Sequence, residues 1–438
     1  MSRTLSSKPD LGQLKNQAKD VLKGHKRKDR AVCGTLRLLR KFAESSDRDI
    51  LAEKLTLNEA QYALAMDYGF TSWNALVHNV EEATMSKPRG KPKRENGKVW
   101  IDGIPKLSWG VSGNCTYAGA LAAALTVTNH PFTYSQIMGY TGLAFRVRWY
   151  RRTDINDWCP SSPVGEFPQE IDTTQRLTGW QFDVKERFGD PDPHRGQFTP
   201  EIVKSIDSGI PVLGHADDLD VAVVYGYQRE GDQLRFLWND YNKPEFVALD
   251  QSTLGPMIII LKGHSPGMEK VDRFISALTS PNWRRKSWTP ENYPEKREHS
   301  YLYGDDALKT WIADIEKADS FTPEQREKLF FVGWWCFAAL RDARDAAATF
   351  MIEHAGLLGE KCSKPLDKAA EIYGRLANML AQPFRDRDVF LGPWTGKSIN
   401  DWTPEVRRRE IEILSEVRKH DAAAIFEIDR ALETYKEK

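Results

Sequence analysis

The feature that most constrains the fold is a change of hydrophobic pattern near the middle of the chain. Three short apolar runs with strand character follow one another at Val212–His215, Asp220–Tyr227 and Leu234–Trp238. The second run is dense in β-branched and aromatic residues, which favours a buried central strand. A fourth run of this kind covers Met257–Leu261. Since helical spacing governs both ends of the chain, the sequence predicts an α+β protein.

Helical patterns occupy the first 80 residues and the last 140 or so. Near the N-terminus, Leu14 and Ala18 belong to a first helix, and Asn58 and Gly69 predict the start and the end of a third. Four C-terminal helices are expected at 305–318, 323–355, 364–382 and 404–436. A further helix is expected at 200–208, and others at 115–129 and 135–138.

The length of 438 residues suggests two or three domains. We expect a helical docking module at 9–80, a linker at 81–98, an α+β domain at 99–299 and a helical domain at 300–438. The linker prediction rests on the charged, Pro- and Gly-containing run at 86–94, which shows no periodicity.

The charge balance indicates no general affinity for polyanions. Lys and Arg number 62, as do Asp and Glu, so nucleic acid is not expected as a partner. Five scattered cysteines form no CxxC pair and fit a reducing compartment. The sequence shows neither a leader-like apolar segment nor a membrane-spanning run. It therefore predicts a soluble, cytoplasmic protein with no metal and no cofactor.

Cys115 stands where a polar loop turns into an apolar helix. The unpaired N–H groups and the partial positive charge of a helix start favour a thiolate, which is how a cysteine nucleophile is often housed. A buried cysteine also serves as a small hydrophobic side chain, and that reading stays open.

The N-terminal segment resembles a small helical segment found beside ankyrin repeats and at the front of assorted bacterial proteins. The residues that carry this resemblance are Leu14–Lys19 and Ala65–Trp73. It implies a protein partner bound through residues 9–80. A basic excess in residues 1–41, with twelve Lys and Arg against three Asp, is read as a solvated face, with weak nucleic-acid contact as the alternative.

The central part resembles the papain-like family that contains the peptidase domain of bacteriocin-processing exporters and the N-terminal domain of butirosin biosynthesis protein H. The carrying segments are Asn114–Tyr117, Gly209–Leu213, Asp220–Tyr227 and Trp238–Asp240. A closer likeness is to uncharacterised bacterial proteins that join this domain to a C-terminal helical one. That likeness rests on Phe132–Arg146 and Trp158–Pro163.

This resemblance implies specific roles around Cys115 as the nucleophile. Asp220 holds the position of the family histidine, and Asp240 that of the acid that orients it. An aspartate is a weaker base than imidazole and raises a nearby thiol pKa, so His215 is considered as a substitute base. Trp109 occupies the position of the oxyanion-binding glutamine.

Asn114 and the backbone N–H of Cys115 are further oxyanion donors that the resemblance leaves available. Cys159 is either part of the same cleft or a buried structural thiol. Trp334, Trp335 and Arg341 belong to an aromatic patch that forms either a substrate pocket with a cationic rim or ordinary helix packing.

Two functions follow as hypotheses. The first is a papain-like cysteine hydrolase or acyltransferase that acts on a small amide, thioester or peptide through Cys115. The second is a catalytically inactive papain-like module that binds a metabolite or peptide between the central and C-terminal domains.

Overall fold

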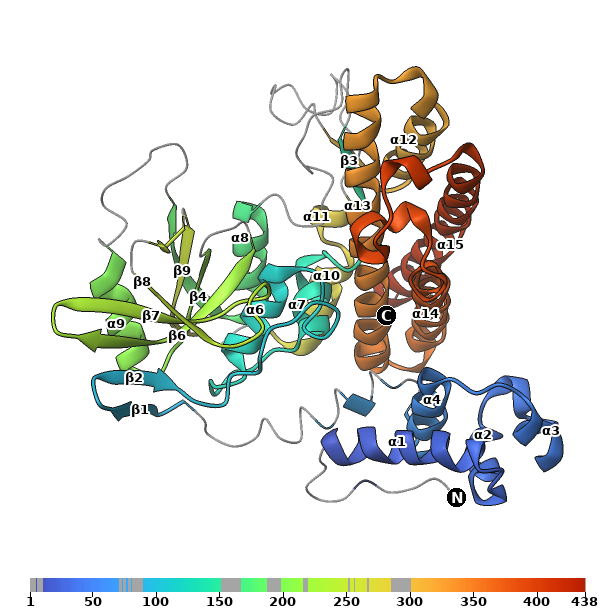
Figure 1. Cartoon of the computed structure of the whole chain (residues 1–438), viewed down its shortest axis with the longest axis horizontal. Coiled ribbons are helices and arrows are strands. Elements are labelled where there is room, and N and C mark those ends of the chain that lie inside the picture. The colour runs from blue at the N-terminus through green and yellow to red at the C-terminus, as the bar shows by residue number, and fades with distance from the viewer. Residues whose placement is uncertain are drawn as a thin grey trace. The chain divides into compact units, whose positions relative to one another are not determined.

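A computed structural model divides the chain into two compact units, residues 1–88 and 89–438 (Figure 1). Each unit is described by itself. The described residues are 5, 11–70, 73, 76–77, 80, 90–150, 167–186, 198–215, 220–250, 253–255, 257–265, 268–284 and 301–437.

The first unit consists of helices. Its elements are α1 (Leu11–Lys26), α2 (Cys33–Leu36), α3 (Asp47–Ala52) and α4 (Leu57–Asp67), with short 3-10 turns at Arg30–Val32 and Arg40–Phe42. A small core forms around Cys33, Leu36 and Ile50. The buried ring of His25, on α1, forms a 2.9 Å hydrogen bond with the carbonyl oxygen of Ile50. This hydrogen bond connects α3 to α1.

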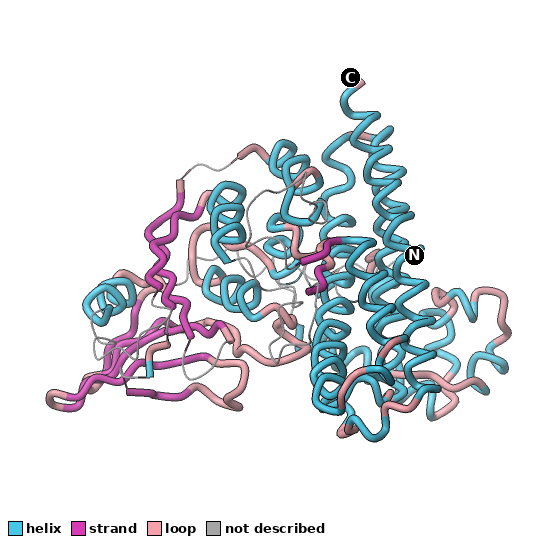
Figure 2. The backbone as a smooth tube through the Cα atoms, turned by 90° about the horizontal axis from the view of Figure 1, so that it is seen from above, coloured by secondary structure: helices cyan, strands magenta, loops and turns pink. Residues whose placement is uncertain are grey.

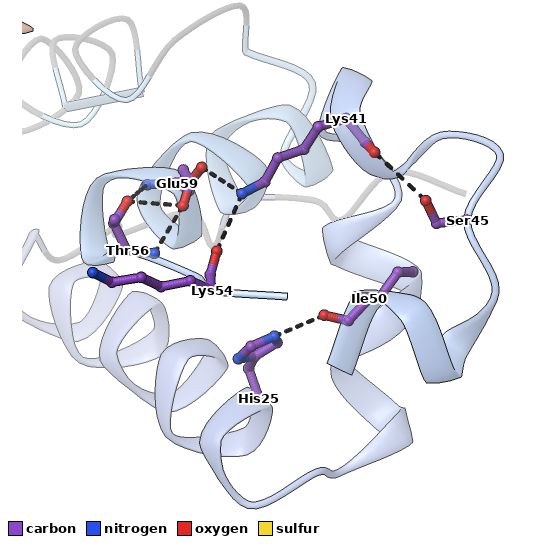
Figure 3. Close-up of polar contacts among 7 residues, drawn as sticks. All are labelled: His25, Lys41, Ser45, Ile50, Lys54, Thr56 and Glu59. Carbon is purple, nitrogen blue, oxygen red and sulfur yellow. Dashed lines mark hydrogen bonds and ion pairs between the residues drawn. The ribbon is translucent and has the colours of Figure 1, made fainter. Parts of the chain in front are cut away.

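The start of α4 corrects the sequence prediction by two residues. Thr56, not Asn58, is the N-cap, because its hydroxyl accepts from the Glu59 N–H at 3.3 Å. The Glu59 carboxylate in return accepts from the Thr56 N–H at 2.8 Å, which completes a capping box (Figure 3). Glu59 also pairs with Lys41 at 2.6 Å. Gly69, at φ +83°, follows the helix end as expected.

The second unit contains an eight-stranded sheet in which every strand pair is antiparallel. The strand order β1-β2-β6-β5-β9-β4 is extended by β7, which pairs with β6 and β8. The strands are β1 (Pro92–Glu95), β2 (Lys98–Ile101), β4 (Trp180–Glu186), β5 (Val212–His215), β6 (Val221–Glu230), β7 (Gln233–Asn239), β8 (Val247–Asp250) and β9 (Met257–His264). The four predicted strands are confirmed as β5, β6, β7 and β9.

The β1–β2 hairpin shows that part of the predicted linker is wrong. Residues 92–95 and 98 belong to strands, and their turn contains Asn96 and Gly97 at φ 46° and 76°. Positive φ at both positions is typical of the two-residue turns that join antiparallel strands. The unpatterned run therefore ends before Pro92, and residues 81–89 lie outside the described residues.

Helices flank this sheet. They are α6 (Thr116–Leu125), α7 (Tyr134–Thr141), α8 (Phe167–Thr178), α9 (Thr199–Asp207), α10 (Lys270–Leu278) and α11 (Pro281–Arg284). Helices α6, α7, α10 and α11 lie between the sheet and the C-terminal helices of the same unit, whereas α9 packs on the sheet at its other side (Figure 1). The small strand β3 (Arg148–Tyr150) pairs with β10 (Tyr301–Tyr303). Helix α6 is rich in alanine and almost fully buried, so it packs closely on β6.

The four predicted C-terminal helices are confirmed within a few residues. They are α12 (Gly304–Glu316), α13 (Pro323–His354), α14 (Glu360–Asp386) and α15 (Pro404–Lys436). Short 3-10 turns lie at Ala318–Ser320, Ala355–Leu358, Val389–Thr395 and Ile399–Asp401. Figure 2 shows the large sheet at one end of this unit and these helices at the other.

Helix α13 joins the two ends of the second unit. It packs on α14 and α7, and Gly139 of α7 leaves room for the ring of Phe350, because a Cβ there would lie 2.2 Å from the ring. The predicted boundary between 299 and 300 lies outside the described residues. The chain on both sides of that boundary belongs to one compact unit.

Candidate functional site

Cys115 is the N-cap residue of α6, as the sequence predicts for the start of this helix. Its backbone is extended, with φ −89° and ψ 100°, and only 1% of the residue is exposed. Gly113, two residues earlier, has φ +85°. A Cβ at Gly113 would lie 2.1 Å from the ring of Tyr134, so only glycine allows this approach. The loop before Cys115 therefore packs directly against the ring of Tyr134.

Tyr134, at the start of α7, binds the backbone of Cys115. The Cys115 N–H donates to the Tyr134 hydroxyl oxygen at 3.1 Å, and that hydroxyl donates to the buried Asp342 carboxylate. Asp342 comes from α13, 208 positions along the chain from Tyr134. Asn114 makes a second connection to α13, because its side-chain amide donates to the carbonyl of Ala338 at 3.3 Å. The loop before α6 and helix α13 thus meet at Cys115.

Burial controls the protonation of the Cys115 thiol. Desolvation raises the pKa of Cys115 to about 12. A hydrogen bond from the backbone of Ala118 and the charge of Arg146 lower this pKa, whereas the negative charges of Glu170 and Asp342 raise it. The thiol is therefore protonated at neutral pH. The expectation that the helix start favours a thiolate is wrong for this structure, because desolvation outweighs the partial charge of one helix end.

A second group of polar side chains is organised by Asn242, just after β7. The Asn242 side-chain oxygen accepts from the Trp109 indole N–H at 2.9 Å, and its amide donates to the Asp220 carboxylate at 2.9 Å. Its backbone N–H donates to the Asp240 carboxylate at 2.6 Å. Three residues named from the sequence therefore share one partner, which the sequence patterns did not single out. The ring of Tyr241 lies 4.9 Å from that of Trp109.

Two hydrogen bonds connect this group to the loop and helix that carry Cys115. The Tyr241 hydroxyl donates to the Ser112 carbonyl at 3.0 Å, and the N–H of Val221 donates to the hydroxyl of Thr116 at 3.1 Å. Gly119 permits the first contact, because a Cβ there would lie 1.8 Å from the tyrosine oxygen. Thr116 follows Cys115 and Val221 follows Asp220, so the start of α6 and the start of β6 lie side by side.

His215 lies at the end of β5, directly opposite Val221 in the sheet register. Its carbonyl accepts from the Gly255 N–H at 2.7 Å, and a Cβ at Gly255 would lie 2.7 Å from the Cβ of His215. His215 therefore packs against the segment that contains Gly255. Residues 216–219, which follow this histidine, lie outside the described residues, as does Cys159, and the role of His215 as a substitute base stays a prediction.

The predicted aromatic pocket lies among the C-terminal helices. Trp334 packs against Phe331 and Trp335, with ring centroids 5.3 and 5.8 Å away. The Arg341 guanidinium lies 5.5 Å from the centre of the Phe384 ring. These contacts are compatible with helix packing, and the substrate pocket with a cationic rim stays a prediction.

A buried ionic cluster near α6 was missed by sequence analysis. Arg146 donates to the Glu170 carboxylate at 2.7 Å, and both side chains are at most 3% exposed. The available signal was the alternation of Arg146 and Arg148 with apolar residues in the run 145–150. Such a pattern places charged side chains at regular positions inside an otherwise apolar segment.

No protein-family model matches the chain, and no curated protein was found with a similar sequence. Among the described residues, no three His, Cys, Asp or Glu side chains are grouped as metal ligands would be. None of the described helices combines the length and the apolar composition that a bilayer crossing requires.

Proposed function

We propose that the chain is a papain-like protein whose former catalytic centre binds a ligand without turnover. The observation that carries this proposal is the state of Cys115: its thiol is buried and its N–H is already bonded to Tyr134. In thiol catalysis that N–H is a natural donor to the oxyanion, and the thiol must lose its proton. Neither group is available in this arrangement.

The order of elements supports the papain-like part of the proposal. A cysteine begins helix α6, Asp220 directly precedes β6, and Asp240 directly follows β7. The position of the family histidine is held by a carboxylate that accepts a hydrogen bond from Asn242. A carboxylate there is a poor base for a thiol and adds negative charge where a thiolate would form. A scaffold kept for binding accounts for this replacement.

Thiol-dependent acyl transfer is the second candidate. The hydrogen bond between Thr116 and Val221 favours it, because it keeps Asp220 beside the start of the helix that carries Cys115. For this reaction the Tyr134 hydroxyl has to leave the Cys115 N–H, and a base has to take the thiol proton. Asp220 would be that base, with Asp240 and Asn242 positioned around it.

Alkylation of Cys115 separates the two candidates. The full chain is treated with iodoacetamide between pH 6 and 9, and each cysteine is followed by peptide mass mapping, with the urea-unfolded chain as reference. With a pKa of about 12, only about 10⁻⁴ of the thiol is ionised at pH 8, against about a quarter for an unfolded cysteine. We expect Cys115 to react at least about 10³-fold more slowly in the folded chain.

Cys362, a fully buried thiol on α14, is the control for burial alone. Labelling of Cys115 below pH 7 at the rate of free cysteine or faster, with Cys362 still protected, would overturn the binding proposal in favour of acyl transfer.

A further inference from the structure

The Arg146–Glu170 pair leaves three buried polar atoms unpaired. One terminal nitrogen of Arg146, Nη1, donates to Glu170 Oε1. The other terminal nitrogen, Nη2, the inner nitrogen Nε and the second carboxylate oxygen, Oε2, have no hydrogen-bond partner among the described residues. Each buried group of this kind costs about 1–3 kcal/mol when unsatisfied, and more when it is charged. The two unpaired nitrogens, which belong to one guanidinium group, therefore point to a missing acceptor.

The two unpaired nitrogens define the shape of that acceptor. Nε and Nη2 lie on one edge of the guanidinium plane, which is the edge that binds both oxygens of a carboxylate. The chain contains an occupied example: Arg344 donates from Nε to one oxygen of Asp421, at 2.8 Å, and from Nη2 to the other. Arg146 presents the same edge without a carboxylate.

The surroundings favour an anion. Arg148, two residues on and 4% exposed, places its guanidinium 4.1 Å from the centre of the Tyr301 ring. Burial and the positive charge of Arg146 both lower the pKa of Arg148. Two buried guanidinium groups near one carboxylate make this a place where a bound negative charge is stabilised.

The pair is connected to the first turn of the Cys115 helix. The hydroxyl of Tyr117 donates to that of Thr174 at 2.9 Å, which donates to the Glu170 carbonyl at 2.7 Å. The charges of Arg146 and Glu170 also act on the Cys115 thiol. A ligand on Arg146 would therefore lie in the same neighbourhood as Cys115.

We propose that the Nε–Nη2 edge of Arg146 binds the carboxylate of a small organic acid. This inference rests on the proposed function, because it names the ligand class that the binding centre takes. A monoanionic carboxylate satisfies both nitrogens at once and adds the negative charge that the two arginines favour. A single water molecule would satisfy the hydrogen bonds without the charge, and the experiment distinguishes it from the acid.

Acetate is the probe, titrated into the full chain by calorimetry at constant ionic strength. Acetamide, which lacks the charge, and chloride, which lacks the two-oxygen geometry, are the controls. We expect saturable binding of acetate, with at least tenfold weaker binding of both controls. Two results would overturn the inference. The first is an equal heat of binding for acetate and chloride. The second is tighter binding of phosphate than of acetate when phosphate is titrated in the same way.

The matched variant is Arg146→Lys, which keeps the charge opposite Glu170 but has no two-nitrogen edge. Acetate affinity should fall at least tenfold in this variant and stay unchanged in Arg235→Lys, the same substitution at an exposed position of β7. Unchanged affinity in Arg146→Lys would contradict the inference. If Arg146→Lys does not fold, the comparison of acetate with acetamide in the unmodified chain decides alone.

The two proposals fail in different ways. Absence of acetate binding with an unreactive Cys115 overturns the carboxylate site and leaves the non-catalytic function standing. A Cys115→Ala variant that binds acetate as tightly as the unmodified chain supports a carboxylate site that does not depend on the thiol. Rapid alkylation of Cys115 would overturn the proposed function and, with it, the premise of the carboxylate site.

Discussion

Removal of the Tyr134 hydroxyl should destabilise the second unit by about 3 kcal/mol. In Tyr134→Phe, the buried Cys115 N–H loses its acceptor, and the buried Asp342 carboxylate loses one donor and keeps the backbone of Asn114 as another. An ordinary hydrogen bond contributes about 0.5–1.5 kcal/mol and one to a charged group about 1.5–3 kcal/mol. The two together give about 2–4.5 kcal/mol. No atom of the substituted ring replaces either bond.

Urea unfolding followed by tryptophan fluorescence measures this loss. Of the 14 tryptophans only Trp73 lies in residues 1–88, so the signal reports mainly on the second unit. The set of variants is Tyr134→Phe, Asp342→Asn and the double substitution, which isolates the pairwise term. We expect a coupling of about 1.5–3 kcal/mol between the two sites. Tyr435→Phe, at the partly exposed end of α15, is the control and should change stability by less than about 0.5 kcal/mol.

The reasoning is refuted if Tyr134→Phe lowers the free energy of unfolding by less than about 1 kcal/mol. It is equally refuted if the effects of the two single substitutions simply add, because the hydroxyl would then contribute nothing through Asp342. Either result would show that α13 does not hold the Tyr134 hydroxyl on the Cys115 N–H through Asp342.

Two further substitutions test other parts of the second unit. Gly113→Ala should lower the free energy of unfolding by at least about 2 kcal/mol, because φ is +85° and the new Cβ would lie 2.1 Å from the Tyr134 ring. The control is Gly374→Ala on α14, where a Cβ meets no atom within 4 Å, and this substitution should not destabilise the protein. Burial raises the pKa of Glu410 to about 8, despite the opposing effect of the Trp402 N–H. The folded state thus holds a proton that the unfolded state has lost, and stability falls between about pH 4.5 and 8, by up to about 1.4 kcal/mol per pH unit. Urea unfolding at several pH values should show that Glu410→Gln removes this slope and is the more stable protein at pH 9; an unchanged slope would contradict the assignment.

Local patterns were sufficient for much of the fold. The Val- and Ile-rich runs gave β5, β6, β7 and β9 because buried strands have that composition. The β1–β2 hairpin was missed because its strands are charged, although Asn96-Gly97 is a strong turn signal. Strand β4 was missed although Trp180, Phe182 and Val184 alternate with polar residues.

The candidate site could be predicted only in part. Asp220 and Asp240 were named from the resemblance to the papain-like family, and Asn242 connects them in the structure. The contact of Tyr134 with Asp342 could not be predicted, because it depends on how α13 packs against α7. The state of the Cys115 thiol follows from that packing rather than from the helix start.

The guanidinium of Arg344 has a consequence for movement within the second unit. It binds both oxygens of Asp421, on α15, and donates to the carbonyl of Ala144 at 2.8 Å, just after α7. Arg344 and Asp421 both lie on C-terminal helices, so their pair would move with those helices. Separation of α13 from α7 would instead break the buried bond to Ala144 and leave that carbonyl without its donor. Any exchange of a molecule near Cys115 that required α13 to move away from α7 would therefore first have to break this bond.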